Sequence, residues 1–195
     1  MKKIYIIFIA LSLNACISAS ISVNNSPAVE KSPNEVSEQD KNTPSSQSKP
    51  EILVGKQDRK ALEQEPYDTW FNKHYENYTV DTETVTKISP YLKDVSIKAF
   101  MGTWCGDSKR ETPTFYKILD AAEFDYENLE LITVTRAKNT PDGLEKGLDI
   151  VRVPTFIFYK DGKEIGRYVE FAQETLEKDI LAIVSGQPYK HSYED

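Results

Sequence analysis

Residues 95–109, Val-Ser-Ile-Lys-Ala-Phe-Met-Gly-Thr-Trp-Cys-Gly-Asp-Ser-Lys, decide the fold. The first seven of them, 95–101, form a short apolar run of β-prone side chains, which predicts a buried strand. A turn with two glycines follows, and residues 108–122 then predict a helix that Pro113 interrupts. This order of elements places Cys105 between a buried strand and the start of a helix.

The rest of the chain predicts a mixed sheet covered by helices. Helical spacing of apolar residues, or proline at a first helical position, predicts helices at 83–92, 140–148 and 175–184. Short β-prone runs predict three more strands, at 129–134, 154–159 and 164–170. The last two strands flank Lys-Asp-Gly-Lys at 160–163, a strong hairpin signal. The order implies a parallel pair early in the chain and an antiparallel hairpin late.

Two separated motifs resemble those of the thioredoxin family. Residues 104–109, Trp-Cys-Gly-Asp-Ser-Lys, are similar to the family's active-site segment Trp-Cys-Gly-x-Cys-Lys. Residues 152–156, Arg-Val-Pro-Thr-Phe, with the hairpin that follows, resemble the family's Ile-Pro-Thr strand and hairpin. The resemblance covers roughly residues 83–186. It implies an α/β fold with a thioredoxin-like mixed sheet flanked by helices.

The resemblance also implies a role for each residue around the predicted site. Cys105 is implied as the nucleophile, and its place before a helix favours the thiolate because unpaired N–H groups and the helix dipole attract negative charge. Trp104 gives the cysteine an apolar wall on one side. Pro154 is implied to be cis and to shape the client groove. Val153 then supplies the amide and carbonyl that pair with a client peptide as an added strand.

Two departures from the family pattern change the expected chemistry. Ser108 stands where the family has its resolving cysteine, and Ala99 stands where the family has a buried acid. A hydroxyl cannot resolve a mixed disulfide, so Cys105 is expected to act alone, as an isomerase or a reductase of small-thiol adducts. Ser108 is expected to tune the thiolate by donating a hydrogen bond to it. The expected function is therefore thiol–disulfide exchange without an internal disulfide.

Two alternative functions stay open. The first is a non-catalytic thioredoxin-fold module that binds clients, in which Cys105 is a buried and inert side chain. The second, a minor alternative, is a monothiol glutaredoxin-like protein, because Cys-Gly-x-Ser also resembles that class. Trp104 and the hairpin at 160–163 favour thioredoxin instead. The reactivity of Cys105 distinguishes an enzyme from a binding module.

The N-terminal residues predict export and attachment to a membrane. Two lysines precede an apolar run that is too short to span a bilayer as a helix, which predicts a signal peptide over residues 1–15. Leu-Asn-Ala-Cys at 13–16 resembles the lipobox of bacterial lipoproteins. That resemblance implies cleavage before Cys16 and lipid attachment to it. Ordinary signal cleavage near Ala19 is the alternative.

The remaining residues divide into four expected parts. Residues 16–50 are rich in Ser, Asn, Pro, Lys and Glu and lack aromatic side chains, so we expect a lipidated cysteine and a disordered tether. Residues 51–82 are expected to be an N-terminal extension, in which the rings between 67 and 78 pack on the domain as an aromatic collar. The thioredoxin-like domain is expected at 83–187, and 188–195 is a C-terminal tail without an interpretable signal.

Composition narrows the classes of partner and cofactor. Lys and Arg number 24 against 31 Asp and Glu, and this net charge of -7 argues against nucleic acid. Two cysteines and two histidines leave no zinc-ligand spacing, so neither metal nor cofactor is expected. The expected partners are cysteine-containing envelope proteins or small thiols, together with an unidentified electron donor. The expected location is the bacterial cell envelope, facing the periplasm, with membrane contact through the lipid anchor only.

Overall fold

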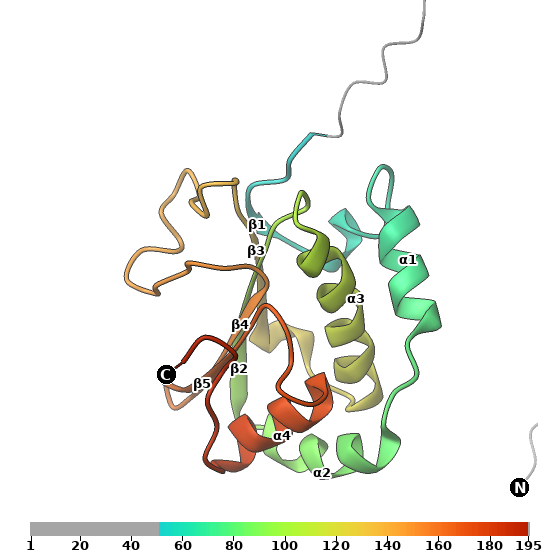
Figure 1. Cartoon of the computed structure of the whole chain (residues 1–195), viewed down its shortest axis with the longest axis vertical. Coiled ribbons are helices and arrows are strands. Elements are labelled where there is room, and N and C mark those ends of the chain that lie inside the picture. The colour runs from blue at the N-terminus through green and yellow to red at the C-terminus, as the bar shows by residue number, and fades with distance from the viewer. Residues whose placement is uncertain (1–50, 195) are drawn as a thin grey trace, which may run out of the picture. The chain divides into compact units, whose positions relative to one another are not determined.

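The computed structural model describes residues 51–194, and the predicted signal peptide, Cys16 and the tether lie outside the described residues. The described strands are β1 (Gly55–Gln57), β2 (Val95–Met101), β3 (Leu129–Thr133), β4 (Thr155–Lys160) and β5 (Lys163–Val169). The described α-helices are α1 (Asp68–Asn77), α2 (Thr82–Leu92), α3 (Gly106–Ala121) and α4 (Leu176–Ser185). Figure 1 shows α1 and α3 on one side of the sheet and the segment 134–153 on the other.

The strands form one mixed sheet in the order β1-β3-β2-β4-β5. The pair β2–β3 is parallel, and the pairs β2–β4 and β4–β5 are antiparallel, which confirms the predicted α/β mixed sheet. β1 pairs antiparallel with β3 at the edge, within the residues that the sequence analysis expected to be an N-terminal extension. Three residues are too few to show the alternation that identifies a strand. The sheet therefore begins well before residue 83.

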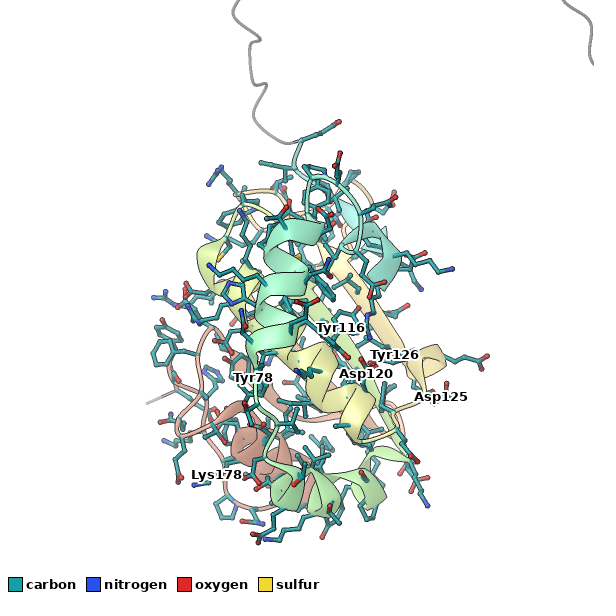
Figure 2. All side chains as sticks on the ribbon, turned by 90° about the vertical axis from the view of Figure 1, so that its right-hand side faces the viewer. Tyr78, Tyr116, Asp120, Asp125, Tyr126 and Lys178 are labelled. Atoms are coloured by element: carbon teal, nitrogen blue, oxygen red, sulfur yellow. The ribbon has the colours of Figure 1, made fainter. Side chains whose placement is uncertain are left out.

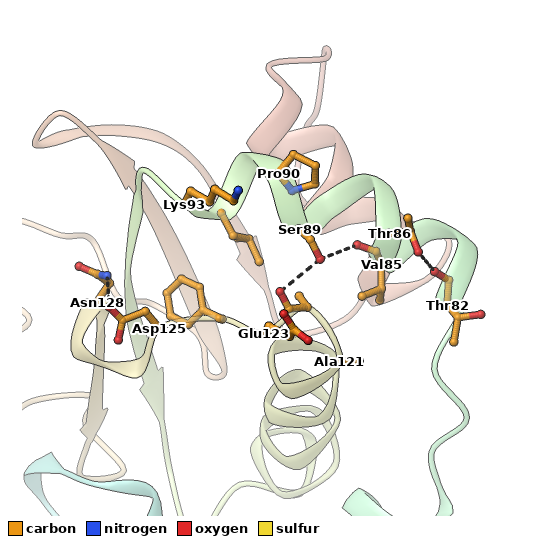
Figure 3. A pocket seen from close by; sticks show the side chains of 13 residues that line it. Thr82, Val85, Thr86, Ser89, Pro90, Lys93, Ala121, Glu123, Asp125 and Asn128 are labelled. Atoms are coloured by element: carbon orange, nitrogen blue, oxygen red, sulfur yellow. Dashed lines mark hydrogen bonds between the residues drawn. The ribbon is translucent and has the colours of Figure 1, made fainter. Parts of the chain in front are cut away.

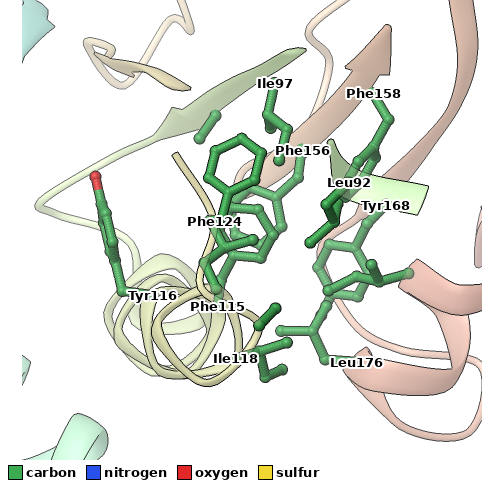
Figure 4. Packing of buried hydrophobic residues seen from close by; sticks show 14 of the residues in the cluster. Leu92, Ile97, Phe115, Tyr116, Ile118, Phe124, Phe156, Phe158, Tyr168 and Leu176 are labelled. Atoms are coloured by element: carbon green, nitrogen blue, oxygen red, sulfur yellow. The ribbon is translucent and has the colours of Figure 1, made fainter. Parts of the chain in front are cut away.

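The core lies between the sheet and α3. Phe115 of α3 stacks on Phe156 of β4 at 4.1 Å between ring centroids, and Phe156 stacks on Tyr168 of β5 at 5.3 Å (Figure 4). All three side chains are fully buried. Aromatic rings bury large apolar areas and favour such offset contacts. This aromatic stack packs α3 against β4 and β5, the two strands that follow Pro154.

Helix α3 differs from its predicted form in two ways. It begins at Gly106 instead of residue 108, with Cys105 as its N-cap residue, and it continues through Pro113 without interruption. A proline inside a helix removes one N–H and its hydrogen bond. Here Pro113 is buried, and the aromatic packing of the next two turns stabilises the helix beyond it. The predicted break was therefore wrong.

The helix predicted at 140–148 was also wrong, because this segment consists of turns. Gly143 and Gly147 adopt left-handed backbone angles, with φ of 68° and 76°. The carboxylate of Glu145 accepts hydrogen bonds from both the backbone N–H and the hydroxyl of Thr140. Such local side-chain bonds compete with helix formation.

The N-terminal extension, which we call the collar, packs on α3. Phe71 of α1 is buried against Tyr116 of α3, with 5.9 Å between the ring centroids. Arg59, in a short 3₁₀ turn, donates hydrogen bonds to Glu63 at 2.6 Å and to Asp120 of α3 at 2.7 Å. Figure 2 shows Tyr116, Asp120 and Tyr126 close together on this side of the molecule. The collar is thus joined to α3 by both apolar and charged contacts.

The C-terminal tail also packs on the domain. Ser192 donates a hydrogen bond to the carbonyl of Phe171 at 2.8 Å, and the ring of Tyr193 meets that of Phe171 edge-on at 5.5 Å. The guanidinium of Arg152 lies 3.7 Å from the centroid of the Tyr193 ring. The tail therefore contacts the loop that leads into β4. Within residues 51–194, no helix is long and apolar enough to cross a membrane.

Candidate functional site

Cys105 lies where the turn after β2 meets the first residue of α3. Its backbone is extended, and its carbonyl accepts the N–H of Lys109 at 3.1 Å as the first bond of the helix. The side chain is partly exposed, and its Sγ donates a hydrogen bond to the carbonyl of Val153 at 3.2 Å. The Val153–Pro154 peptide bond is cis. The fold thus brings together two motifs that are 48 residues apart in the chain.

Ser108 faces the interior and is fully buried. Its Oγ accepts a hydrogen bond from the backbone N–H of Gly102 at 3.1 Å. Ser108 thus supports the turn after β2, and the hydrogen bond expected from its hydroxyl to the Cys105 thiolate stays a prediction. Among residues 51–194, Cys105 is the only cysteine.

Trp104 is held firmly beside the cysteine. Its indole Nε1 donates to the carbonyl of Val134 at 2.9 Å, and the guanidinium of Arg136 lies 5.1 Å from the ring. The ring covers Gly102 so closely that a Cβ atom there would lie 2.6 Å from it. Glycine at this position is therefore required by the close approach of the indole.

Of the two cations in the first turn of α3, Arg110 forms ion pairs with carboxylates of the described residues and Lys109 does not. Arg110 pairs with Asp107 at 2.8 Å and with Glu111 at 2.7 Å. Partial burial opposes the charge of Arg110, but the two carboxylates outweigh it and raise the pKa of the guanidinium. Arg152, near Pro154, pairs with Glu170 at 3.0 Å. Lys109 has no ion pair within the described residues, which leaves it as the uncompensated cation beside Cys105.

Two cavities lie at opposite ends of α3. The first, of about 360 Å³, separates the collar from the active-site turn and is lined by Glu51, Ile52, Pro66, Tyr67, Trp70, Thr103, Trp104, Lys109 and Arg136. We call it the collar cavity. The second, of about 650 Å³, lies between α2 and the end of α3, where Ser89 bridges the two helices (Figure 3). Sixteen helical residues span about 24 Å, so the larger cavity is remote from Cys105.

The sequence had identified the thiol, its neighbours and the proline, but not the collar cavity. Tyr67 and Trp70 belong to the rings expected to pack as the aromatic collar, and Lys109 belongs to the active-site motif. No local pattern reveals that these side chains share one cavity, because they come from three separate segments. Within residues 51–194 no cluster of His, Cys, Asp and Glu is placed to hold a metal ion.

Comparisons with known proteins agree with this geometry. A thioredoxin-like protein of Acanthamoeba polyphaga mimivirus is 30% identical over 96 residues, which cover 49% of this chain and 67% of that protein. The thioredoxin of Ictalurus punctatus is 31% identical over 105 residues, which cover 52% of this chain and 94% of the relative.

A crystal structure of a Pseudomonas aeruginosa protein of unknown function has the same fold, with a TM-score of 0.51 at 16% identity. The match covers 67% of this chain and 93% of that one. A family model described as thioredoxin matches residues 56–182. Because that match spans well over half of the sequence, the chain belongs to the thioredoxin family.

Proposed function

We propose that this protein carries out thiol–disulfide exchange on exported proteins in the bacterial cell envelope, with Cys105 as its nucleophile. The observation that carries the proposal is the position of Cys105, which is the N-cap residue of α3 and whose Sγ lies 3.2 Å from the carbonyl oxygen of Val153 beside the cis-proline. A helix N-terminus favours a thiolate, and the thiolate is the attacking species.

The proposed reaction forms a mixed disulfide. The thiolate of Cys105 attacks one sulfur of a client disulfide, the Sγ–S bond forms, and the client S–S bond breaks. The departing client sulfur keeps the electron pair and takes up a proton from solvent. Cys105 is oxidised to the mixed disulfide while one client sulfur is reduced to a thiol.

Release of the client requires a thiol from outside the domain. Ser108 occupies the position one helical turn after Cys105, and a hydroxyl does not displace a sulfur. A second thiol of the client completes an isomerisation, and a small thiol completes the removal of an adduct. Both routes restore the free thiol of Cys105 without a cofactor.

The groove beside Pro154 supplies the backbone contacts for the client. The carbonyl of Val153 accepts the Cys105 thiol in this structure, and ionisation of the thiol releases that carbonyl for the amide of a client strand. Trp104 closes one side of the site through its bond to Val134. Client binding and thiol ionisation thus depend on the same acceptor.

The N-terminal residues complete the proposal. Cleavage before Cys16 and lipidation of that residue would tether the domain to a membrane facing the periplasm. Labelling with a radioactive fatty acid, compared between the natural chain and a Cys16→Ser variant, tests this part separately. Loss of label in the variant supports the anchor, and equal label in both refutes it.

The central experiment uses the chain with Cys16→Ser, in which Cys105 is the sole thiol. After incubation with a small disulfide, mass spectrometry is expected to show one adduct on Cys105, and a further Cys105→Ser change should abolish it. The adduct should be removed by a small thiol at neutral pH. Absence of adduct on the folded protein would overturn the proposal and favour a non-catalytic client-binding module.

A further inference from the structure

We infer that the collar cavity binds the carboxylate of a small thiol that is disulfide-bonded to Cys105. This inference rests on the proposed exchange activity and assigns its substrate class: mixed disulfides of carboxylate-bearing small thiols. The supporting observations are the size of the cavity, two cations that have no acidic partner among the described residues, and the contacts that tie each cation to Cys105 or to its neighbour Trp104.

The size of the cavity suits a small molecule. Its volume of about 360 Å³ lies at the lower end of the range for small-ligand pockets, about 300–1,000 Å³. Rings from both sides line it, with Tyr67 and Trp70 from the collar and Trp104 from the active-site turn. Aromatic walls with a few polar groups are typical of such pockets.

The charge of the cavity suits an anion. Lys109 and Arg136 both line it, and neither forms an ion pair within residues 51–194. The other two cations near the thiol, Arg110 and Arg152, are already paired with carboxylates. Glu51 also lines the cavity, but its carboxylate forms no ion pair with either cation. In a chain of net charge -7, two unpaired cations in one cavity favour a negatively charged ligand.

Each cation is tied in the structure to Cys105 or to its neighbour Trp104. Lys109 is one turn after Cys105, and their backbones are joined by the first hydrogen bond of α3. Four helical residues advance the backbone by about 6 Å, so the Lys109 side chain starts one turn away from the residue that carries the sulfur. Arg136 lies over the ring of Trp104, the residue that precedes the cysteine. Cys105 itself does not line the collar cavity, so an acidic thiol on the sulfur would place its carboxylate at these cations by extending past the Trp104 ring.

The test compares three disulfides of similar size: 3,3′-dithiodipropionate, 2-hydroxyethyl disulfide and cystamine, which are anionic, neutral and cationic. The rate of adduct formation on Cys105 is measured for each with the Cys16→Ser chain. The anionic disulfide is expected to react about fivefold faster than the neutral one, in keeping with the modest value of each exposed charge pair. The cationic disulfide should be the slowest.

Variants that remove the two positive charges test whether the faster reaction of the anionic disulfide depends on the cavity. Lys109→Gln combined with Arg136→Gln should bring the anionic and neutral rates together. Lys87→Gln, on the exposed surface of α2, should leave their ratio unchanged. The neutral disulfide controls for changes in the thiolate itself, because it reports nucleophilicity without a charge at the subsite.

The outcomes separate this inference from the proposed function. Equal rates for the anionic and neutral disulfides would overturn the subsite while leaving exchange at Cys105 intact, as would a preference that survives in the double variant. Failure of all three disulfides to react would overturn both proposals. A preference for the disulfide of a cysteine peptide with acidic neighbours over dithiodipropionate would overturn the assignment to small thiols.

Discussion

Replacing Arg59 with Met is expected to destabilise the protein by about 3 kcal/mol, because this side chain joins the collar to α3. The bond to Asp120 is partly shielded, with the two side chains 26% and 31% exposed, and is worth about 1.5 kcal/mol as a charged hydrogen bond. The i,i+4 pair with Glu63 adds about 0.5 kcal/mol. The guanidinium also lies 5.0 Å from the Tyr75 ring and 5.1 Å from the Tyr116 ring, and these contacts add about 1 kcal/mol.

Urea unfolding followed by circular dichroism measures this loss directly. In a thermal unfolding experiment on the same variant, the melting temperature of a domain of this size should fall by about 9 °C. Lys87→Met is the matched control, because Lys87 forms an exposed i,i+4 pair with Glu83 and should lose less than about 0.5 kcal/mol. If the two variants lose the same stability, the contacts of Arg59 do not hold the collar and the reasoning fails.

Three further changes give distinct results. Ser108→Cys should stop the mixed disulfide at Cys105 from accumulating, because residues at i and i+3 of a helix start can form a disulfide, and the protein should lose two mass units on oxidation; an unchanged adduct yield would contradict this. Burial raises the pKa of the Asp179 carboxyl above its value in the unfolded chain. The folded protein therefore loses stability as the pH rises through the range in which this carboxyl ionises. Asp179→Asn removes the charge, so it should raise the melting temperature at pH 7 but not near pH 3. A larger gain at low pH would show that the sign is wrong. Gly102→Ala should cost about 1–3 kcal/mol by pushing on the neighbouring indole ring, whereas Gly106→Ala, which meets nothing within 4 Å, should be tolerated; equal costs in urea unfolding would refute the close approach.

The parts of the fold that could be predicted are those that repeat a strong local signal. The hairpin of β4 and β5 followed from Asp-Gly between two β-prone runs, and β2 followed from seven mostly apolar residues. Edge strand β1 could not be found, because three residues carry no periodicity and their pairing partner β3 lies more than 70 residues away. The proline near the start of 140–148 predicted a helix there. Two glycines in this segment instead adopt left-handed backbone angles, which interrupt a helix.

In the candidate site, too, residues that belong to a local motif could be predicted, whereas contacts between distant segments could not. Cys105 and Pro154 could be named from their motifs, and the contact between the sulfur and Val153 brings those motifs together. The sequence could not separate Lys109 from Arg110, since both are cations in the first turn of α3. Only the folded arrangement shows that Arg110 faces two carboxylates while Lys109 lines a cavity.

The placement of the indoles gives the protein an intrinsic optical reporter. The chain has two tryptophans, and Trp70 and Trp104 both line the collar cavity. Indole emission responds to nearby charge and solvent, so a molecule that enters the cavity changes the fluorescence of the whole protein without any label. Trp70→Phe isolates the emission of Trp104, whose ring adjoins the cysteine. Oxidation of the thiol and occupation of the cavity can then be followed in one sample, in real time, without an added label.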